Sequence, residues 1–220
     1  MPERLATARV LIAGVGSLGS PVAATLAGAG VGVIGLADPA AVASDRLEGH
    51  LLHLAADDGH NKAERAAARL GAFNPSAEAV PYPARVDELN AAAIVAGHDL
   101  VVDCTNDASA TLVLNDACLE LGVKFLTVRL NGTAAVLTAI VPPDGGCCRC
   151  AFPELETAAP DADPPPGAAS VVGSLLALEA IKLLTGAGEP LVAQVLHVDL
   201  AAPAMETRPY ERVTGCEVCG

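Results

Sequence analysis

Aromatic residues are almost absent from this chain of 220 residues, which has no tryptophan and only 2% aromatic residues in total. Proteins that bind single-stranded nucleic acid usually stack the bases on aromatic side chains, and too few are present here for such a platform. Positive charge is scarce as well, because 13 Lys and Arg stand against 26 Asp and Glu and leave a formal charge of −13. Both deficits predict that the protein has no nucleic-acid partner.

Several motifs of known chemistry are missing too. No G-x-S-x-G, H-E-x-x-H or G-x-x-x-x-G-K-[ST] pattern occurs, so nothing points to a serine hydrolase, this class of zinc protease or a P-loop enzyme. The five histidines show no metal-binding spacing, and we interpret them as ordinary residues. They are His50, His53, His60, His98 and His197. The first residues do not form a basic leader ahead of an apolar run, so we predict a cytoplasmic protein with no membrane partner.

The most informative stretch is residues 10–38, which carries no charge before its last residue. The apolar run Val10–Ala13 predicts a buried strand, a small-residue segment predicts a helix, and a second run, Val31–Ala37, ends at Asp38. A G-x-G-x-x-G motif lies between the first run and the helix, made by Gly14, Gly16 and Gly19. This order is typical of the nucleotide-binding βαβ unit, where the glycines approach a phosphate and the acid binds ribose hydroxyls. NAD, FAD and ATP all remain open as ligands at this point.

Strand and helix signals alternate up to residue 128 and then change. The alternating segments are helices at 61–73, 88–95 and 108–121 and strands at 78–82, 99–103 and 124–128. Later strands are expected at 133–141, 191–199 and 205–210, with a helix at 170–185. We predict one domain, residues 1–220, with an α/β Rossmann-like, doubly wound mixed sheet that is parallel in its N-terminal half and antiparallel in its C-terminal strands. Residues 153–169 hold five prolines and predict a mobile crossing loop.

Four polar residues are candidates for ligand contacts. Lys62 lies at a predicted helix start, where it could pair with phosphates, although such a lysine by itself is more often a solvated surface residue. Asp103, Asn106 and Asp107 follow a central strand at its carboxyl end, where open α/β sheets bind ligands. They could hold Mg²⁺ through one or two carboxylates. Helix N-capping by Asn106 or Asp107 is an equally good interpretation.

The seven cysteines include two pairs at metal-binding spacing. These pairs are Cys147-x-x-Cys150 and Cys216-x-x-Cys219, and each has a glycine beside it. Together they predict a structural zinc knuckle with four thiolate ligands, which would fasten the C-terminal segment to the sheet. The other three, Cys104, Cys118 and Cys148, have no partner at this spacing.

Longer segments carry a resemblance to a known family. They are RVLIAGVGSLGSPVAATLAGAGVGVIGLAD at 9–38, LLHLAADDGHNKAE at 51–64, DLVVDCTND at 99–107, CCRCAFPE at 147–154 and the terminal GCEVCG. Together they resemble the ThiF/MoeB/HesA family, which shares its adenylation domain with ubiquitin-activating enzymes. The resemblance implies an adenylyltransferase that uses ATP with Mg²⁺ to activate the C-terminal Gly-Gly carboxylate of a small ubiquitin-like sulfur-carrier protein. It further implies a homodimer.

The resemblance also implies residue roles. Asp38 would bind the ribose, the glycine motif and Lys62 would face the phosphates, and an aspartate near 107 would hold magnesium. The family's S-N-L-x-R-Q segment is altered here, because Arg46 replaces its asparagine and Gly49 its phosphate-binding arginine. We expect Arg46 to be the substitute. These departures leave a non-catalytic relative open as an alternative, whereas the cysteine pairs make an NAD-dependent oxidoreductase improbable.

Overall fold

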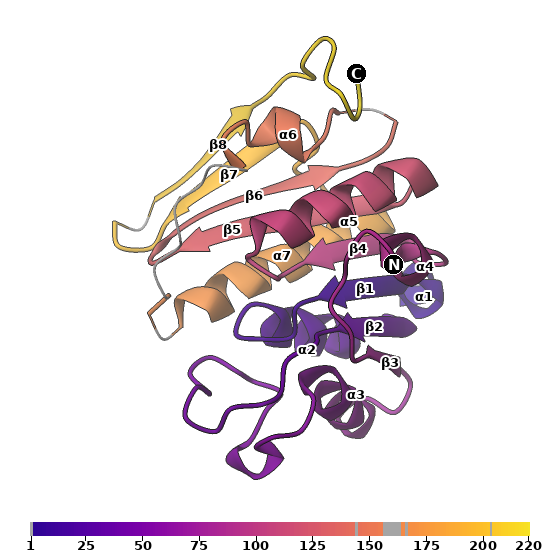
Figure 1. Ribbon diagram of the computed structural model, residues 1–220, viewed down its shortest axis with the longest axis vertical. Coiled ribbons are helices and arrows are strands. Elements are labelled where there is room, and N and C mark those ends of the chain that lie inside the picture. Colours follow the sequence, from indigo (N-terminus) through magenta and orange to yellow (C-terminus); the bar gives the residue numbers. More distant parts are fainter. Residues whose placement is uncertain (1, 144, 156–163, 166, 203) are drawn as a thin grey trace.

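The computed structural model describes residues 2–143, 145–155, 164–165, 167–202 and 204–220 (Figure 1). These residues form an eight-stranded sheet with the order β3-β2-β1-β4-β5-β6-β7-β8. The first five strands are parallel: β1 Arg9–Ala13, β2 Val33–Ala37, β3 Glu78–Tyr82, β4 Leu100–Asp103 and β5 Lys124–Asn131. The last three pair antiparallel: β6 Ala134–Ile140, β7 Gln194–Asp199 and β8 Ala204–Pro209. The predicted mixed, doubly wound sheet is confirmed.

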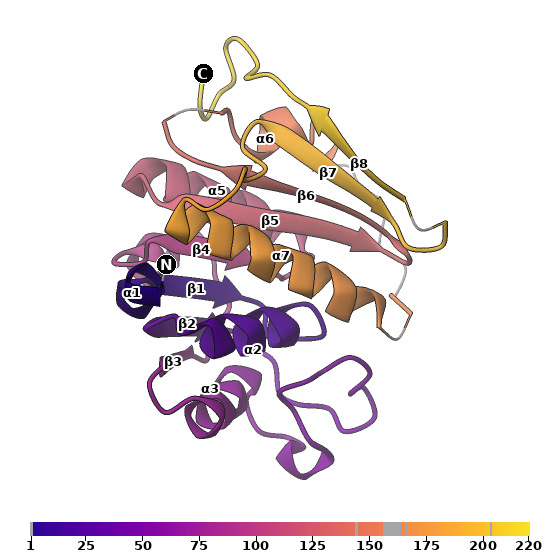
Figure 2. The same ribbon diagram turned by 180° about the vertical axis from the view of Figure 1, so that it is seen from behind.

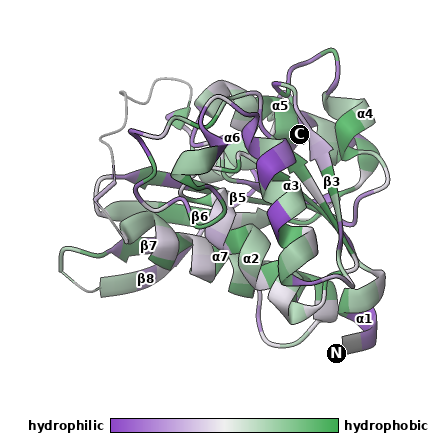
Figure 3. Cartoon of the chain, turned by 90° about the horizontal axis from the view of Figure 1, so that it is seen from below, coloured by the Kyte–Doolittle hydropathy of each residue, from purple (hydrophilic) through white to green (hydrophobic). Residues whose placement is uncertain are grey.

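Helices cover both faces of the sheet, as the two opposite views show (Figures 1 and 2). On one face lie α1 Pro2–Thr7, α2 Gly19–Ala29, α3 Lys62–Phe73 and α7 Ala168–Thr185. On the other lie α4 Ala91–Val95, α5 Ala108–Leu121 and the short α6 Cys148–Ala151. A 3₁₀ turn, η1 Ala55–Asp57, interrupts the loop before α3. Each face has its own aliphatic core, and hydrophobic residues gather on the strands between the helical layers (Figure 3).

Small residues let two helices of the first face pack closely. Gly173 in α7 lies against the start of α2, where an added Cβ would be only 2.6 Å from Pro21 Cγ and 2.7 Å from the Leu18 carbonyl oxygen. α7 is the one helix of the described segments that is long and apolar enough to span a membrane by length and composition, and 56% of that window is buried inside the fold. Its apolar residues therefore line the core against α2 and the sheet.

Two strands begin later than the sequence predicts, each because of the backbone conformation just before it. Val31 donates its backbone N–H to the Leu26 carbonyl oxygen and so closes helix α2 before β2 begins at Val33. Ala193 has a φ of 55°, which breaks the predicted strand 191–199 and delays β7 to Gln194. Most of the predicted crossing loop 153–169 lies outside the described residues, and its last two residues belong to α7.

The strand order reverses between β1 and β4. β1 runs onward to β2 through α2, whereas β4 continues on the other side to β5 through α5. The carboxyl ends of β1, β2 and β4 therefore come together with the loops diverging above them. Open α/β sheets bind ligands in the crevice at such a switch point.

Candidate functional site

Two of the three glycines in the turn after β1 are required by the fold, each for a different reason. Gly14 has a φ of 83°, and an added Cβ would lie 2.7 Å from the Cys104 carbonyl oxygen after β4. A Cβ on Gly19 would lie 1.9 Å from the Gly14 carbonyl oxygen, so only glycine lets helix α2 begin here. Gly16 is less confined, and the atom closest to its missing Cβ is His50 Nε2 at 3.8 Å. The backbone therefore requires glycine at positions 14 and 19, whereas a Cβ at position 16 would make only ordinary van der Waals contacts.

Asp38, at the end of β2, is joined to this turn by hydrogen bonds. One carboxylate oxygen accepts the backbone N–H of Val15 and the other accepts that of Ala40, each at 2.8 Å. The Asn61 amide donates to the Asp38 carbonyl oxygen at 3.0 Å, which ties in the start of α3 as well. The residue as a whole is 7% exposed and lines a cavity, so these hydrogen bonds hold it in place at the edge of the crevice.

A cavity of about 190 Å³ opens beside Asp38. The residues around it include Gly14, Asp38, Arg85, Val86, Thr105 and Asp107. A larger cavity of about 530 Å³ runs along α4 and α5, away from the glycine turn. We place the site at the smaller cavity, because Gly14 of the glycine turn, the acids Asp38 and Asp107, and one arginine line it.

Asp103 lies beneath this cavity and is fully buried. One of its oxygens accepts from the Thr105 hydroxyl at 2.7 Å and the Thr105 N–H at 3.0 Å. The other accepts from the hydroxyls of Thr111 in α5, at 2.6 Å, and Thr127 in β5, at 2.8 Å. Four donors satisfy a buried carboxylate, and three elements are joined through it. Asp103 thus braces the floor of the site and does not face the crevice.

Asn106 fixes the loop that follows β4. It has a φ of 54°, a left-handed conformation that asparagine tolerates better than most residues. Its side-chain amide pairs with the backbone of Leu130 in β5, donating to the carbonyl oxygen at 2.8 Å and accepting the N–H at 2.9 Å. This clamp sets the direction in which the next residue points.

Asp107 is the N-cap of α5, which confirms the capping interpretation made for this segment. One carboxylate oxygen accepts the backbone N–H groups of Ser109 and Ala110, at 2.9 and 3.2 Å. The other pairs with Arg85 at 3.2 Å, and the Asp107 side chain is 44% exposed. This second oxygen is the one that a ligand or cation in the cavity can reach.

Lys62 is the first residue of α3, as predicted. Asn61 caps the helix, its side-chain oxygen accepting the Glu64 N–H at 3.1 Å, and so fixes where the lysine side chain starts. The lysine lies close enough to His50 to lower the pKa of that imidazole. Arg46 is exposed on the loop between β2 and α3, with its backbone N–H donated to Ala43.

This loop is anchored to α3 by a buried carboxylate. Asp57 accepts the Leu54 N–H at 2.8 Å and an Arg69 N–H at 2.9 Å, and Arg69 also donates to the Leu52 carbonyl oxygen at 2.7 Å. The backbone N–H of Leu54 and the guanidinium of Arg69 lower the pKa of Asp57. The anchored loop then turns back over the glycine turn.

His50 is the residue that sequence reasoning missed. We interpreted it as ordinary, but the loop places its ring beside Gly16. Burial, then the charge of Lys62 and the neighbouring His53, lower the pKa of His50 to about 4, against a weaker opposing effect of Asp38. The imidazole is therefore neutral near pH 7. The sequence shows that His53 follows His50 by three residues, but no spacing in the sequence predicts that this loop folds over the glycine turn.

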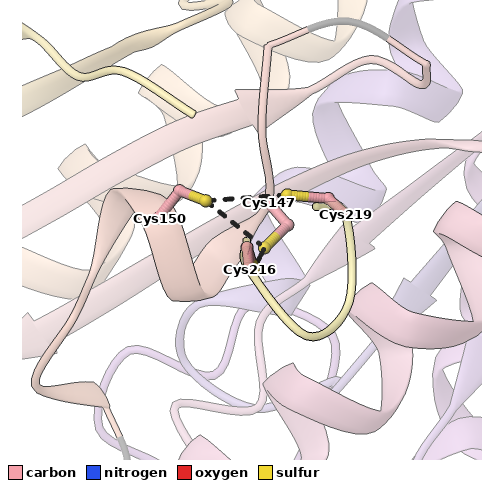
Figure 4. A group of neighbouring side chains, drawn as sticks. All are labelled: Cys147, Cys150, Cys216 and Cys219. Carbon is pink, nitrogen blue, oxygen red and sulfur yellow. Dashed lines mark hydrogen bonds between the residues drawn. The ribbon is translucent and has the colours of Figure 1, made fainter. Parts of the chain in front are cut away.

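The four predicted zinc ligands form one cluster (Figure 4). Cys147 Sγ lies 3.8 Å from Cys150 Sγ and 3.7 Å from Cys216 Sγ, and Cys150 Sγ lies 3.6 Å from Cys219 Sγ. Tetrahedral zinc with Zn–S bonds of about 2.3 Å requires sulfur atoms ~3.8 Å apart, so the cluster fits this metal. Backbone N–H groups of Cys219 and Val218 lower the pKa of Cys216 to about 6, which favours the thiolate that a metal needs.

The remaining cysteines are buried outside this cluster. Cys148 is completely buried, and its backbone N–H donates to the Asn115 side chain at 2.9 Å. Burial raises the pKa of Cys104, Cys118 and Cys148, which keeps these thiols protonated. Cys104 and Cys118 both belong to the hydrophobic core.

Comparisons with known proteins match nearly the whole chain to one family. Residues 2–218 match the ThiF family. The chain is 36% identical to the SAMP-activating enzyme E1 of Haloferax volcanii, over 99% of this chain and 82% of that protein. It is 35% identical to the molybdopterin-synthase adenylyltransferase of Salmonella typhimurium, over 99% and 89%. The crystal structure of Escherichia coli MccB with ATP superposes with a TM-score of 0.88 at 22% identity, covering 100% of this chain and 68% of that one.

Proposed function

This chain belongs to the ThiF family, and we propose that it uses ATP to activate a ubiquitin-like sulfur-carrier protein. The two relatives named above are an activating enzyme and an adenylyltransferase. The bond formed joins an oxygen of the carrier's C-terminal glycine carboxylate to the α-phosphorus of ATP. The bond broken is that between the α- and β-phosphates, and pyrophosphate leaves with its electron pair. The product is an acyl-adenylate.

One observation supports this proposal above the others: the Asp38 carboxylate and the glycine turn form a single hydrogen-bonded unit at the switch point of the sheet. In the proposed complex Asp38 accepts the ribose hydroxyls. The N–H groups of the turn and the start of α2 face the phosphates, where the partial positive charge of a helix N-terminus favours anions. Lys62 adds a full positive charge from the start of α3. Attack on an α-phosphate needs such positioning and neutralisation more than covalent help from the protein.

Two metal ions belong to the proposal. Zinc would be held by Cys147, Cys150, Cys216 and Cys219, which fit it in distance and donor type, and its role is structural. Magnesium accompanies ATP as part of the substrate. The outer oxygen of Asp107, which pairs with Arg85 in this structure, would contact it, whereas the buried Asp103 orients the loop below through its threonine contacts.

We propose further that the chain forms no thioester or persulfide of its own. Cys104, Cys118 and Cys148 are buried with raised pKa values, so none presents a reactive thiolate. The other cysteines belong to the four-cysteine cluster, and residues 151–215 contain no cysteine at all. Sulfur transfer would then occur on another protein that receives the activated carrier.

The carrier is expected to end in Gly-Gly, and the enzyme to act as a cytoplasmic homodimer. A second candidate function is that of a family relative that binds nucleotide or carrier without turning it over. The replacement of the family's phosphate-binding arginine by Gly49 favours this alternative, because it removes a positive charge. The experiment that separates the two is mass spectrometry of candidate carriers incubated with the protein and ATP–Mg²⁺. An added adenylyl group on the wild-type carrier, absent when its last glycine is deleted, supports catalysis, and no adduct on any carrier supports the alternative.

A further inference from the structure

The loop between β2 and α3 is seated directly on the glycine turn. An added Cβ on Gly49 would lie 3.2 Å from Ser17 Cβ, and one on Gly16 would lie 3.8 Å from His50 Nε2 and 3.9 Å from His50 Cε1. Gly49 has a φ of 77° and offers no side chain, so the first group that the loop presents to the turn is the His50 imidazole. The Nε2 edge of the imidazole faces the glycine turn at Gly16, and the backbone N–H groups of this turn would contact a phosphate.

The second nitrogen of this imidazole is buried. His50 Nδ1 has no hydrogen-bond partner in the part of the chain that the structure describes, and the same holds for His53 Nδ1. His53 Nε2 lies 3.1 Å from the Lys62 carbonyl oxygen, which can only accept, so His53 carries its proton on Nε2. The two rings meet edge to face at 5.5 Å, so His53 holds the buried side of His50 in place. The accessible polar atom of His50 is Nε2.

Charged and titratable groups from three parts of the fold lie close enough to His50 to affect its pKa. They are Lys62 at the start of α3, His53 and Glu48 on its own loop, and Asp38 at the end of β2. Lys62 opposes a second positive charge, and burial acts in the same direction. A ligand that places negative charge between Lys62 and His50 reverses this balance, because it stabilises the protonated imidazole.

We propose that His50 is a phosphate-binding residue of this site, which donates its Nε2–H to a phosphate oxygen of a nucleotide bound over Gly16. The inference rests on the proposed nucleotide site and adds the residue that recognises its phosphates. A bound phosphate also raises the pKa of His50 from its low value in the free protein, so phosphate binding becomes linked to proton uptake as the pH falls. The affinity for ATP should therefore rise as the pH falls from 8 toward 6, while the affinity for adenosine should not.

Calorimetric titration of the full chain with ATP–Mg²⁺ and with adenosine tests this inference. We expect His50→Ala to weaken ATP binding about tenfold or more, the loss of one hydrogen bond to a charged group, and to leave adenosine binding within about twofold. His50→Gln keeps an N–H donor at a similar reach and should restore most of the affinity, without the pH dependence of the wild type. The matched control is His60→Ala, since His60 is an exposed histidine of the same loop.

A measurement on the wild type distinguishes the loss of a phosphate contact from a folding defect in the variant. The titration of the His50 ring, followed by nitrogen NMR, should move to a higher pH when ATP is added and stay unchanged with adenosine. Equal losses of ATP and adenosine affinity in His50→Ala, or a His50 titration that ATP does not move, would overturn the inference while leaving the nucleotide site intact. A wild-type protein that binds no ATP would overturn the inference together with the proposed function.

Discussion

The carboxylate of Asp38 and the backbone N–H of Val15 are joined by a 2.8 Å hydrogen bond, so the acid that ends β2 and the glycine turn that follows β1 form one rigid unit. A ligand that touches the turn therefore meets an acid at a fixed distance. This rigidity lowers the conformational entropy lost on binding. It also means that a substitution at Asp38 affects both the ligand contact and the shape of the turn.

We predict that Asp38→Asn weakens ATP binding by about 1.5–3 kcal/mol, because the amide carries no charge and offers one acceptor oxygen where the carboxylate offers two. The matched control is Asp99→Asn, since Asp99 also accepts a backbone N–H, that of Arg9 at 2.8 Å, but at the opposite end of the sheet. Calorimetry of both variants gives the comparison. Similar ATP affinity in the two variants, or tighter binding of NADH than of ATP–Mg²⁺ by the wild type, would contradict the assignment of the ribose site.

We predict one zinc ion per chain at the four-cysteine cluster. Elemental analysis of freshly purified, unchelated protein should give this stoichiometry, and Cys216→Ser should lower it and loosen the C-terminal segment more than the nucleotide turn. Cys148→Ala is the control, because Cys148 lies beside the ligands in sequence but is buried outside the cluster. Zinc loss in Cys148→Ala comparable to that in Cys216→Ser would argue against this ligand set.

The anchor of the loop that carries His50 should make part of the stability depend on pH. The folded-state pKa of Asp57 lies below its ordinary value, so its stabilising contribution is present above that ordinary value and is lost as the pH falls through the lowered one. We predict that Asp57→Asn lowers the free energy of unfolding by roughly 1.5–3 kcal/mol at pH 7. Denaturant titrations from pH 7 to pH 3 should show the difference from wild type shrinking. A difference that stays constant over this range would show that the carboxylate charge is not what anchors the loop.

Much of the fold was predictable because its signals are local. The strand, glycine turn, helix and acid of residues 10–38 lie in one continuous stretch, and the spacing of two C-x-x-C pairs was enough to predict the four-cysteine cluster. The Asp103 cluster was not predictable, because Thr111 and Thr127 come from two later elements that only the folded sheet brings to it. His50 was missed for the same reason. Its place over Gly16 depends on the path of a loop fixed by Asp57 and Arg69, and no periodicity records that path.

Arg46 is the predicted replacement for the missing arginine of the family, and its role remains a prediction. We expect Arg46→Ala to abolish pyrophosphate exchange if its guanidinium reaches the phosphates of the bound nucleotide. Because Arg46 is exposed, its removal should leave the free energy of unfolding unchanged within about 0.5 kcal/mol. Arg208→Ala, which removes an exposed arginine on the distant strand β8, is the control. Exchange that persists in Arg46→Ala would transfer the role to Lys62 and His50.

If this chain activates a carrier carboxylate with ATP, as we propose, it should catalyse ATP–pyrophosphate exchange. Labelled pyrophosphate should enter ATP only when the protein, Mg²⁺ and a carrier with an intact C-terminal glycine are all present. We predict carrier-dependent exchange that is slow, because Gly49 supplies no charge to the phosphates, and that is lost in Asp38→Asn. Exchange that proceeds without any carrier, or that no ubiquitin-like carrier supports while ATP still binds, would contradict this proposal.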